Sequence, residues 1–483
     1  MKKHIKLLSL TACLLAVTTA CESTLETLPT ASIDKDIALQ EASGVEAFLV
    51  STYDNLQSSG YYGRDFICVP EVLSDNMYVV SSNSNRFVNE SNNQIRSQIN
   101  IWNIAYNTIN KANGIIKYVG NAAGMTDARK KQVQGEALFL RALAYFDLIK
   151  TYAYAPGKAP NNFDLGVPLQ LEYVEAFPTD IKYPTRAKAS EVYAQIKKDL
   201  EAAIGLLDNS KAPKFASKVA AQALRARAAL YLGEWADAVK YATDAINAGG
   251  NGYNTFVSDP TKYWSIFTTA QSPESIFEVN FEQNESLGSD CLGSIYSRNN
   301  YPSSPSLSGA GYGDISPQAN LVNLYETGDV RKDLLFSITK GSERIFWNLK
   351  YPSAKAPNVD NTKILRISEM YLIRAEANAN LNNTADALTD LNRIRTRAGL
   401  KALTGLTGTA LLDAVLKERR IELAYEGIRW FDLIRLNADV IKTRSATVAT
   451  VNETIKATDY RLLAPIPQGE LDVNKSLVQN PGY

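Results

Sequence analysis

Apolar residues recur at helical spacing through the middle of the chain. Tyr193, Ile196 and Leu200 are separated by three and four positions, which lines one face of a helix. This helix is expected to open near Ser190. Short alternating runs such as 275–281 predict a few strands beside the helices. The chain is therefore predicted to be mainly α-helical, with a few short strands.

An internal repeat groups the predicted helices into units. The pattern apolar-Arg-Ala-x-Ala occurs three times, at 140–144, 224–228 and 373–377. The last two copies continue in register, because 235–239 matches 384–388 at the same offset of 149 residues. Self-similarity at a constant offset indicates a repeated supersecondary unit.

The residues of the repeat are those that close-packed helical hairpins need. Alanine lets two helix axes approach, and Gly233 or Asn382–Asn383 supplies a short break between helices. The pattern resembles tetratricopeptide hairpins and predicts them around 130–250 and 364–435. The gaps between copies far exceed the tetratricopeptide period of about 34 residues. Long insertions therefore separate the units within a single predicted domain, 36–483.

Two irregular stretches differ in composition from the helices. Residues 81–93 read SSNSNRFVNESNN, and residues 292–318 are rich in serine, glycine, proline, asparagine and tyrosine. The second stretch belongs to a loop-rich insertion around 251–363 that is expected to face a ligand. Loops of this length inside a compact protein are usually functional or disordered.

The charge balance and the histidine content exclude several classes of function. Lysine plus arginine equals aspartate plus glutamate at 51 each, so no basic field attracts nucleic acid. The single histidine, His4, lies in a basic stretch that is expected to be removed. A chain without imidazole cannot build a Ser-His-Asp triad or a histidine-ligated zinc site. Phosphate-binding loops, dinucleotide fingerprints and nucleophile elbows are also absent from the sequence, so we expect neither an enzyme nor a cofactor.

The N-terminus has the features of a bacterial lipoprotein signal. Residues 1–20 contain lysines, then an apolar stretch too short to span a bilayer, then small residues ending in Ala20. We expect cleavage before Cys21, whose acyl chains would hold the protein at a membrane surface, with 21–35 as a tether. Cleavage before Cys13 and a plain signal peptide are the alternatives.

Cysteine usage does not indicate a disulfide framework. Four cysteines are too few for one in a chain of 483 residues. Apart from the two near the N-terminus, only Cys68 and Cys291 remain. They could pair only if the fold brings them together, which the sequence leaves open.

Aromatic residues are abundant, with 25 tyrosines, 15 phenylalanines and 5 tryptophans. A sugar ring has apolar C–H faces that stack on aromatic rings, and hydroxyls that Asn, Asp and Arg can bridge with paired hydrogen bonds. Such a site needs no group that titrates at neutral pH, so a chain without histidine can build one. The candidate ligand-binding residues are Tyr78, Asn83, Arg86 and Phe87 in or beside the first stretch, and Tyr296, Arg298, Asn299, Tyr301 and Tyr312 in the second, with Trp347 as a further candidate.

Each of these residues has a structural alternative. Tyrosines in long loops often pack the loop against its own scaffold. The residues that sit in helical pattern are interpreted as core, namely Trp102, Tyr106, Arg141, Trp235 and Trp430. Asp329 and Arg331 are interpreted as a paired structural turn rather than a metal site.

Longer segments of the chain resemble a known family. They are ILRISEMYLIRAEANA (364–379), LKERRIELAYEGIRWFDLIR (416–435), LLAPIPQGELDVNKSLVQNPGY (462–483) and GEALFLRALAYFDLIKTYAYAP (135–156). They resemble the SusD/RagB family of Bacteroidetes outer-membrane nutrient-binding lipoproteins, and the resemblance covers essentially the whole chain.

The resemblance implies a helical protein, lipid-anchored at the cell surface, that is not an enzyme. It implies a lid on a SusC-like TonB-dependent transporter, which captures oligosaccharide and delivers it to the barrel. The same architecture carrying peptides is one alternative, and a glycosidase on a helical scaffold is another. Family ligand contacts lie outside the recognisable motifs, so the candidate residues rest on composition alone.

Overall fold

The computed structural model describes residues 39–159, 162–175, 182–249, 252–297, 311–340, 343–353 and 358–483. Half of the chain is helical, and the strands form small two-stranded sheets. The predicted fold class, mainly α with a few short strands, is therefore confirmed. Cys21, Arg298, Asn299 and Tyr301 lie outside the described residues.

The helices are α3 (Ala42–Asp54), α4 (Asp65–Leu73), α5 (Val88–Ser91), α6 (Trp102–Tyr118), α7 (Asp127–Tyr152), α8 (Ala189–Leu206), α9 (Lys218–Leu232), α10 (Trp235–Asn247), α11 (Ser265–Thr268), α12 (Leu292–Tyr296), α13 (Ala319–Val322), α14 (Ile367–Asn380), α15 (Thr384–Arg397), α16 (Gly408–Glu422), α17 (Arg429–Arg435) and α18 (Gln468–Val473). The strands are β1 (Met77–Val79), β2 (Ser275–Val279), β3 (Ile315–Pro317), β4 (Leu335–Lys340), β5 (Glu343–Asn348), β6 (Thr362–Arg366), β7 (Val440–Lys442) and β8 (Glu453–Ile455).

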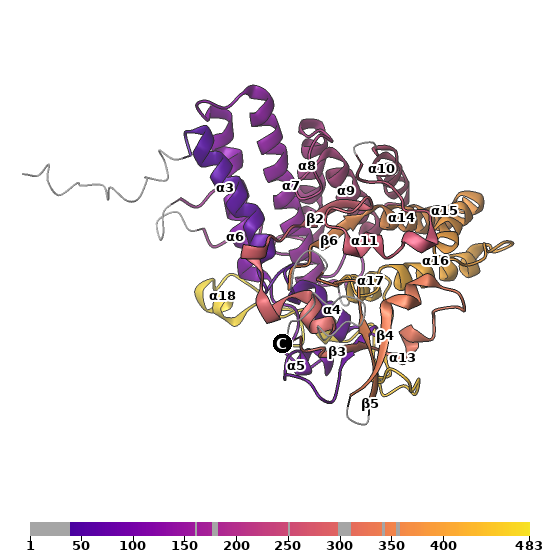
Figure 1. Ribbon diagram of the computed structural model, residues 1–483. Helices are drawn as coiled ribbons and strands as arrows, with labels where there is room; N and C mark the ends of the chain where they lie inside the picture. Colours follow the sequence, from indigo (N-terminus) through magenta and orange to yellow (C-terminus); the bar gives the residue numbers. More distant parts are fainter. Residues whose placement is uncertain are drawn as a thin grey trace, which may run out of the picture.

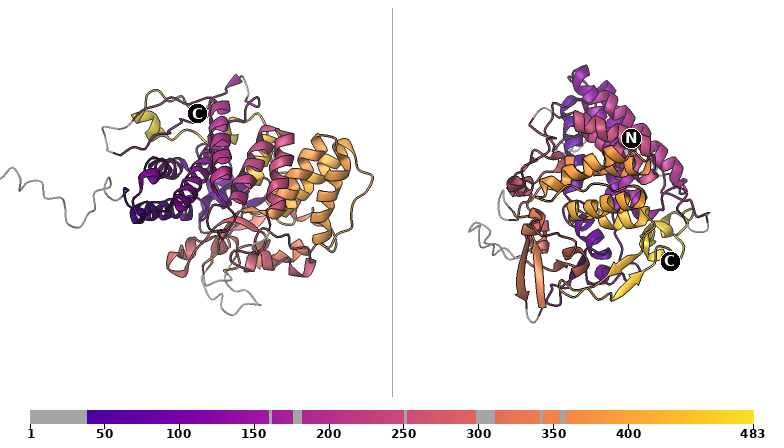
Figure 2. Two further views of the ribbon diagram at one scale, coloured as in Figure 1. Left: turned by 90° about the horizontal axis from the view of Figure 1, so that it is seen from above. Right: turned by 90° about the vertical axis from the view of Figure 1, so that its right-hand side faces the viewer.

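The long helices pack as a row of antiparallel neighbours. From one end, α6 packs against α7, α7 against α8, α8 against α9, α9 against α10, and α10 against α14, which is followed by α15 and α16 (Figures 1 and 2). Alanine fills the contacts between these helices, and Ala226, Ala228 and Ala242 are completely buried. Small side chains thus let successive hairpins stack on one continuous core.

The internal repeat corresponds to two equivalent hairpins. Helices α9 and α14 begin 149 residues apart, and so do α10 and α15. Gly233 ends the first helix of one hairpin with φ +70°, and Asn382 occupies the equivalent break in the other with φ +61°. Both turns use the left-handed conformation that favours glycine and, after it, asparagine. The same turn geometry is thus built from two different residues.

The residues interpreted as core all lie in helices, and each is buried or partly buried. Trp102 and Trp430 are buried, whereas Tyr106 and Trp235 are partly buried. Arg141 is buried and forms a bidentate ion pair with Asp199, at 2.6 and 2.8 Å.

The turn interpretation of the Asp329 segment is also confirmed. Arg331 Nη2 lies 2.7 Å from Asp329 Oδ2, and both side chains are buried.

The strands and irregular segments form a second layer along one side of the helical row (Figure 1). Strand β1 pairs with β3, β2 with β6, β4 with β5, and β7 with β8, all antiparallel. Each pair except β4–β5 and β7–β8 joins segments more than 80 residues apart in sequence. The pairs β1–β3 and β2–β6 therefore bring segments that are distant in sequence together in this layer.

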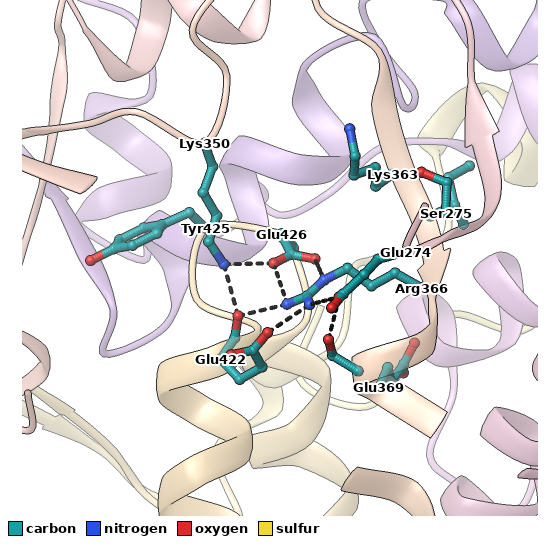
Figure 3. A network of polar contacts seen from close by, with 12 residues as sticks. Glu274, Ser275, Lys350, Lys363, Arg366, Glu369, Glu422, Tyr425 and Glu426 are labelled. Atoms are coloured by element: carbon teal, nitrogen blue, oxygen red, sulfur yellow. Dashed lines mark hydrogen bonds and ion pairs between the residues drawn. The ribbon is translucent and has the colours of Figure 1, made fainter. Parts of the chain in front are cut away.

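A buried charge network joins the two layers (Figure 3). Arg366, at the end of β6, contacts Glu422 of α16 and also Glu426, at 2.6 and 2.8 Å. Lys350 Nζ lies 2.6 Å from Glu426 Oε1. All four side chains are almost fully excluded from solvent. We call Glu274, Lys350, Arg366, Arg397, Glu422 and Glu426 the buried charge network.

The remaining members extend the network to α15. Arg397 lies 2.6 Å from Glu422 and 2.8 Å from Glu274, which directly precedes β2. Burial alone would raise the pKa of Glu422, but Arg397, Arg366 and the other nearby cations hold that pKa far below its usual range. The Glu422 carboxylate is therefore charged and paired in the folded protein.

Cys68 and Cys291 are both free and buried. The sequence left their pairing open, and the fold keeps them apart. Among the residues that the structure describes, no helix is long and apolar enough to cross a membrane.

Candidate functional site

The two irregular stretches meet through the pairing of β1 with β3. Tyr78 lies opposite Ser316, and the register continues as Val80 N–H donates to the Asp314 carbonyl at 2.9 Å. The chain leaving β1 carries the first irregular stretch, and the chain entering β3 carries the end of the second. Side chains more than 200 residues apart in sequence are thereby brought to one surface.

A polar and aromatic cluster forms where these stretches meet. The Arg86 guanidinium carbon lies 4.1 Å from the centroid of the Tyr312 ring, a cation–π contact. Arg86 Nη2 and Arg64 Nη1 both contact Asp290 Oδ1, at 2.9 and 2.8 Å. The Arg86 side chain is 30% exposed and the Asp290 side chain 43%, so both reach solvent. We call Arg64, Arg86, Asp290 and Tyr312 the Arg86 cluster.

The loop that carries Arg86 is fixed by its own side chains. Asn83 Nδ2 donates to the Val80 carbonyl at 2.6 Å, and Asn83 Oδ1 accepts from Asn85 N–H at 2.7 Å. Ser84 donates through both its N–H and its hydroxyl to the carboxylate of Asp314. Such side chain–backbone bonds hold a loop without regular secondary structure. The Arg86 side chain is therefore presented from a defined backbone.

A buried lysine anchors the far end of the same stretch. Lys442 Nζ donates to the carbonyl oxygens of Val72 and Ser91, at 2.7 and 2.8 Å, and to Asn93 Oδ1. Burial, followed by the nearby positive charge of Arg444, lowers the Lys442 pKa well below its ordinary value. The ammonium group ties the end of α4 and the end of the first stretch to β7.

Two of the other predicted tyrosines are buried rather than exposed. Tyr78 is buried, and its hydroxyl donates to Glu343 at 2.5 Å. Tyr296 is completely buried, stacks on Tyr351 and donates to the Tyr425 carbonyl at 3.2 Å.

Two more predicted aromatic residues lie mostly inside the fold. Phe87 is buried beneath Arg64, and Trp347 is buried against Phe336. Of the predicted set, the fold therefore brings Asn83, Arg86, Phe87 and Tyr312 together. Arg64, Asp290 and Asp314 join them without having been predicted. No composition or spacing signal distinguishes those three residues in the sequence.

A recess of about 430 Å³ is lined by Asn83 and other residues of the first irregular stretch. Glu343 and Arg444 lie in its wall, and Ser81 donates to Glu343 through both its N–H and its hydroxyl. Burial, followed by the bond to Glu343, raises the pKa of Tyr78, so this hydroxyl stays protonated. The recess and the cluster are thus both built in part from the first irregular stretch.

A second recess, of about 590 Å³, lies between α6 and α18. Its polar side chains are largely used by the protein itself, because Asn110 pairs with the Val174 backbone and Asn474 donates to the Pro184 carbonyl. What remains is mainly apolar, including Tyr183, which is 52% exposed. Hydroxyl-rich ligands need polar partners, so this recess suits a sugar less well than the Arg86 cluster does.

The geometry favours binding over catalysis. The cluster combines an aromatic ring, two guanidinium groups and an accessible carboxylate, which can stack on a ligand and bridge its hydroxyls. Among the described residues, no group of three His, Cys, Asp or Glu side chains could hold a metal ion. The described chain is thus a helical scaffold that carries a loop-built candidate binding surface.

Comparison with known proteins places this scaffold in a family. The SusD family model matches residues 337–483, and a SusD-like model described as "Starch-binding associating with outer membrane" matches residues 25–232. The chain belongs to the SusD/RagB family, as its sequence motifs predicted. This is a family of binding proteins without catalytic activity, so the expectation that the protein is not an enzyme is confirmed.

Curated relatives extend over the same length. The SusD-like protein P38 of Formosa agariphila is 25% identical over 538 aligned positions, covering 100% of this chain and 99% of the relative. The starch-binding protein SusD of Bacteroides thetaiotaomicron is 25% identical, covering 76% of this chain and 75% of the relative.

Solved structures share the fold. A putative sugar-binding protein from Bacteroides vulgatus superposes with a TM-score of 0.79 at 28% identity, covering 92% of this chain and 99% of that protein. A SusD superfamily protein from the same organism superposes with a TM-score of 0.80 at 26% identity, with the same coverage.

Proposed function

We propose that this protein captures oligosaccharide or polysaccharide at the cell surface and delivers it to a SusC-like TonB-dependent outer-membrane transporter, acting as its lid. The observation that carries the binding role is the Arg86 cluster, where Arg86, Asp290 and Tyr312 form an accessible polar and aromatic surface. The descriptions of the starch-binding family model and of the sugar-binding relative support a glycan as the ligand.

The transporter role follows from family membership. In this proposal the helical row faces the transporter and the second layer faces the glycan. Cys21, once acylated, keeps the protein at the outer membrane while the lid opens and closes. Loss of membrane retention in a Cys21→Ala variant, with Cys13→Ala as the matched control, tests the anchor. Co-purification of the protein with a SusC-like barrel from the same cells tests the partnership.

The binding role is tested by calorimetry of the mature chain against a panel of glycans and protein hydrolysates. Tyr312→Ala is expected to weaken glycan binding about ten-fold, because an aromatic contact contributes about 0.5–1.5 kcal/mol. Tyr183→Ala removes an exposed tyrosine in the other recess and serves as the matched control. An unchanged affinity in Tyr312→Ala, together with a loss in Tyr183→Ala, would move the site to that recess. Binding of peptides alone would replace glycan by peptide as the cargo.

A further inference from the structure

We propose that the glycan bound at the Arg86 cluster is uncharged, an inference that rests on the proposed function and narrows it. The observation behind it is that positive and negative side chains balance around Tyr312. The described charged side chains at and beside the cluster are the cations Arg64, Arg86 and Lys340 and the carboxylates Asp65, Asp290 and Asp314. Their formal charges cancel.

Each of these cations already has an acceptor. Arg64 and Arg86 share Asp290, and Arg64 also contacts Asp65 at 2.7 Å. Lys340 Nζ donates to the Tyr312 carbonyl at 3.4 Å. To gain Arg64 or Arg86 as a partner, an anionic group on a ligand would therefore have to compete with Asp290 or Asp65, and to gain Lys340 it would have to compete with the Tyr312 carbonyl.

A sugar hydroxyl does not face this obstacle, because it can donate and accept hydrogen bonds at once. One hydroxyl can donate to the exposed carboxylate of Asp290 while a neighbouring hydroxyl accepts from Arg86. A carboxylate or sulfate at the same place can only accept. It would stand beside Asp290 with no proton to share, and the two negative charges would repel each other.

The recess beside Asn83 and Glu343 offers no compensating positive charge. Glu343 lies in its wall, and its one described cation, Arg444, is paired with Glu453. A glycan that reached this recess would meet the carboxylate of Glu343 and a guanidinium group, that of Arg444, which Glu453 already neutralises. Both parts of the surface thus select against acidic glycans.

The inference is tested by calorimetry of the mature chain with neutral and acidic glycans. The neutral set is starch, xylan, mannan, galactan and laminarin, and the acidic set is alginate, polygalacturonate and carrageenan. We expect the best neutral ligand to bind at least about ten-fold more tightly than any acidic one at ionic strengths of about 0.01 and 0.15 M. Tighter binding of an acidic glycan would overturn this inference and leave the proposed function standing. Binding of no glycan would overturn both.

Two variants separate charge selection from simple loss of the site. Asp290→Asn removes the carboxylate partner of Arg86 and leaves Arg64 paired with Asp65 alone, so binding of acidic glycans should rise at least about ten-fold and fall again with salt. Asp472→Asn, which changes a 63% exposed carboxylate on α18, is the matched control and should change nothing. Arg86→Gln should weaken neutral glycans without admitting acidic ones, and circular dichroism checks the fold of each variant. An Asp290→Asn protein that folds and still rejects acidic glycans would contradict the proposal.

Discussion

At the scale of single residues, Lys442 shows how a loop without regular structure can be held in place. Its ammonium group donates to two backbone carbonyls and one side-chain amide oxygen, and no carboxylate is among these acceptors. One oxygen of α4 and two oxygens of the first irregular stretch therefore depend on a single donor group. Lys442 therefore holds in place the end of the stretch that carries Arg86.

Replacement of this donor should be costly. In Lys442→Met the three oxygens stay buried and lose their partner, and an unsatisfied buried acceptor costs about 1–3 kcal/mol. We expect the free energy of unfolding, measured by urea denaturation, to fall by about 3 kcal/mol or more. Hydrogen exchange within 88–93 should accelerate as well.

Lys475→Met is the matched control for Lys442→Met. The Lys475 side chain is 77% exposed and has one ion pair at 4.0 Å, so its loss should change stability by less than about 0.5 kcal/mol. Equal stabilities of the two variants would show that Lys442 does not anchor the loop.

The residue scale also shows which part of the site the sequence could predict. Arg86 and Tyr312, which the fold brings into contact, were predicted because each lies in a stretch whose composition suits a ligand. Tyr78 and Tyr296 carry the same compositional signal, yet both are buried, because burial depends on which chain segments cover a loop. Asp290 joins the site only through contacts with Arg64 and Arg86, and a contact between distant positions leaves no mark in a single sequence.

At the scale of elements, the helical hairpins are the part of the fold that the sequence predicts best. Helices α9 and α14, with the turns at Gly233 and Asn382, occupy equivalent positions at a constant offset. Their pattern is local, since alanine spacing and a turn residue act within one hairpin. The strand pairs β1–β3 and β2–β6 are non-local, and short apolar runs do not identify their partners.

The two hairpin turns form a natural pair of experiments. Gly233→Ala places a side chain at φ +70°, which should lower the free energy of unfolding by about 1 kcal/mol. The new Cβ would meet Trp235 no closer than 3.6 Å, so the cost is conformational rather than steric.

Asn382→Gly makes the opposite change at the equivalent turn and should leave stability within about 0.5 kcal/mol of the parent. Urea denaturation of both variants measures the difference. A loss of the same size in both would mean that the left-handed conformation does not determine these turns.

At the scale of the whole molecule, the buried charge network couples the helical row to the second layer. Arg366 comes from the strand layer, whereas Glu422 and Arg397 come from α16 and α15. Removal of one partner of a buried ion pair leaves the other charge uncompensated. The two layers should therefore unfold together.

Acid should expose this coupling. The pKa values of Glu422 and Glu426 lie below their usual range in the folded protein, because the nearby cations outweigh the effect of burial. The stability that these groups contribute is present above the unfolded pKa of about 4.3 and is lost as pH falls toward the folded pKa.

Urea midpoints measured between about pH 7 and pH 3 should fall steeply below about pH 4.5. The change should appear as one transition by both far-ultraviolet and tryptophan signals. Two separated transitions, or a midpoint that rises in acid, would contradict a network that joins the layers.

Cys68 and Cys291, which are both free and buried, can report where the fold opens. Burial raises the pKa of the Cys68 thiol, and it raises that of Cys291 to about 12. Neither thiol should react with an alkylating reagent while the protein stays folded, because the thiolate is the reactive form. Cys68 lies in α4 and Cys291 immediately before α12, so each thiol reports the opening of a different part of the second layer. The order in which Cys68 and Cys291 become alkylated in the mature chain would show which part of that layer opens first. The experiment needs no engineered cysteine.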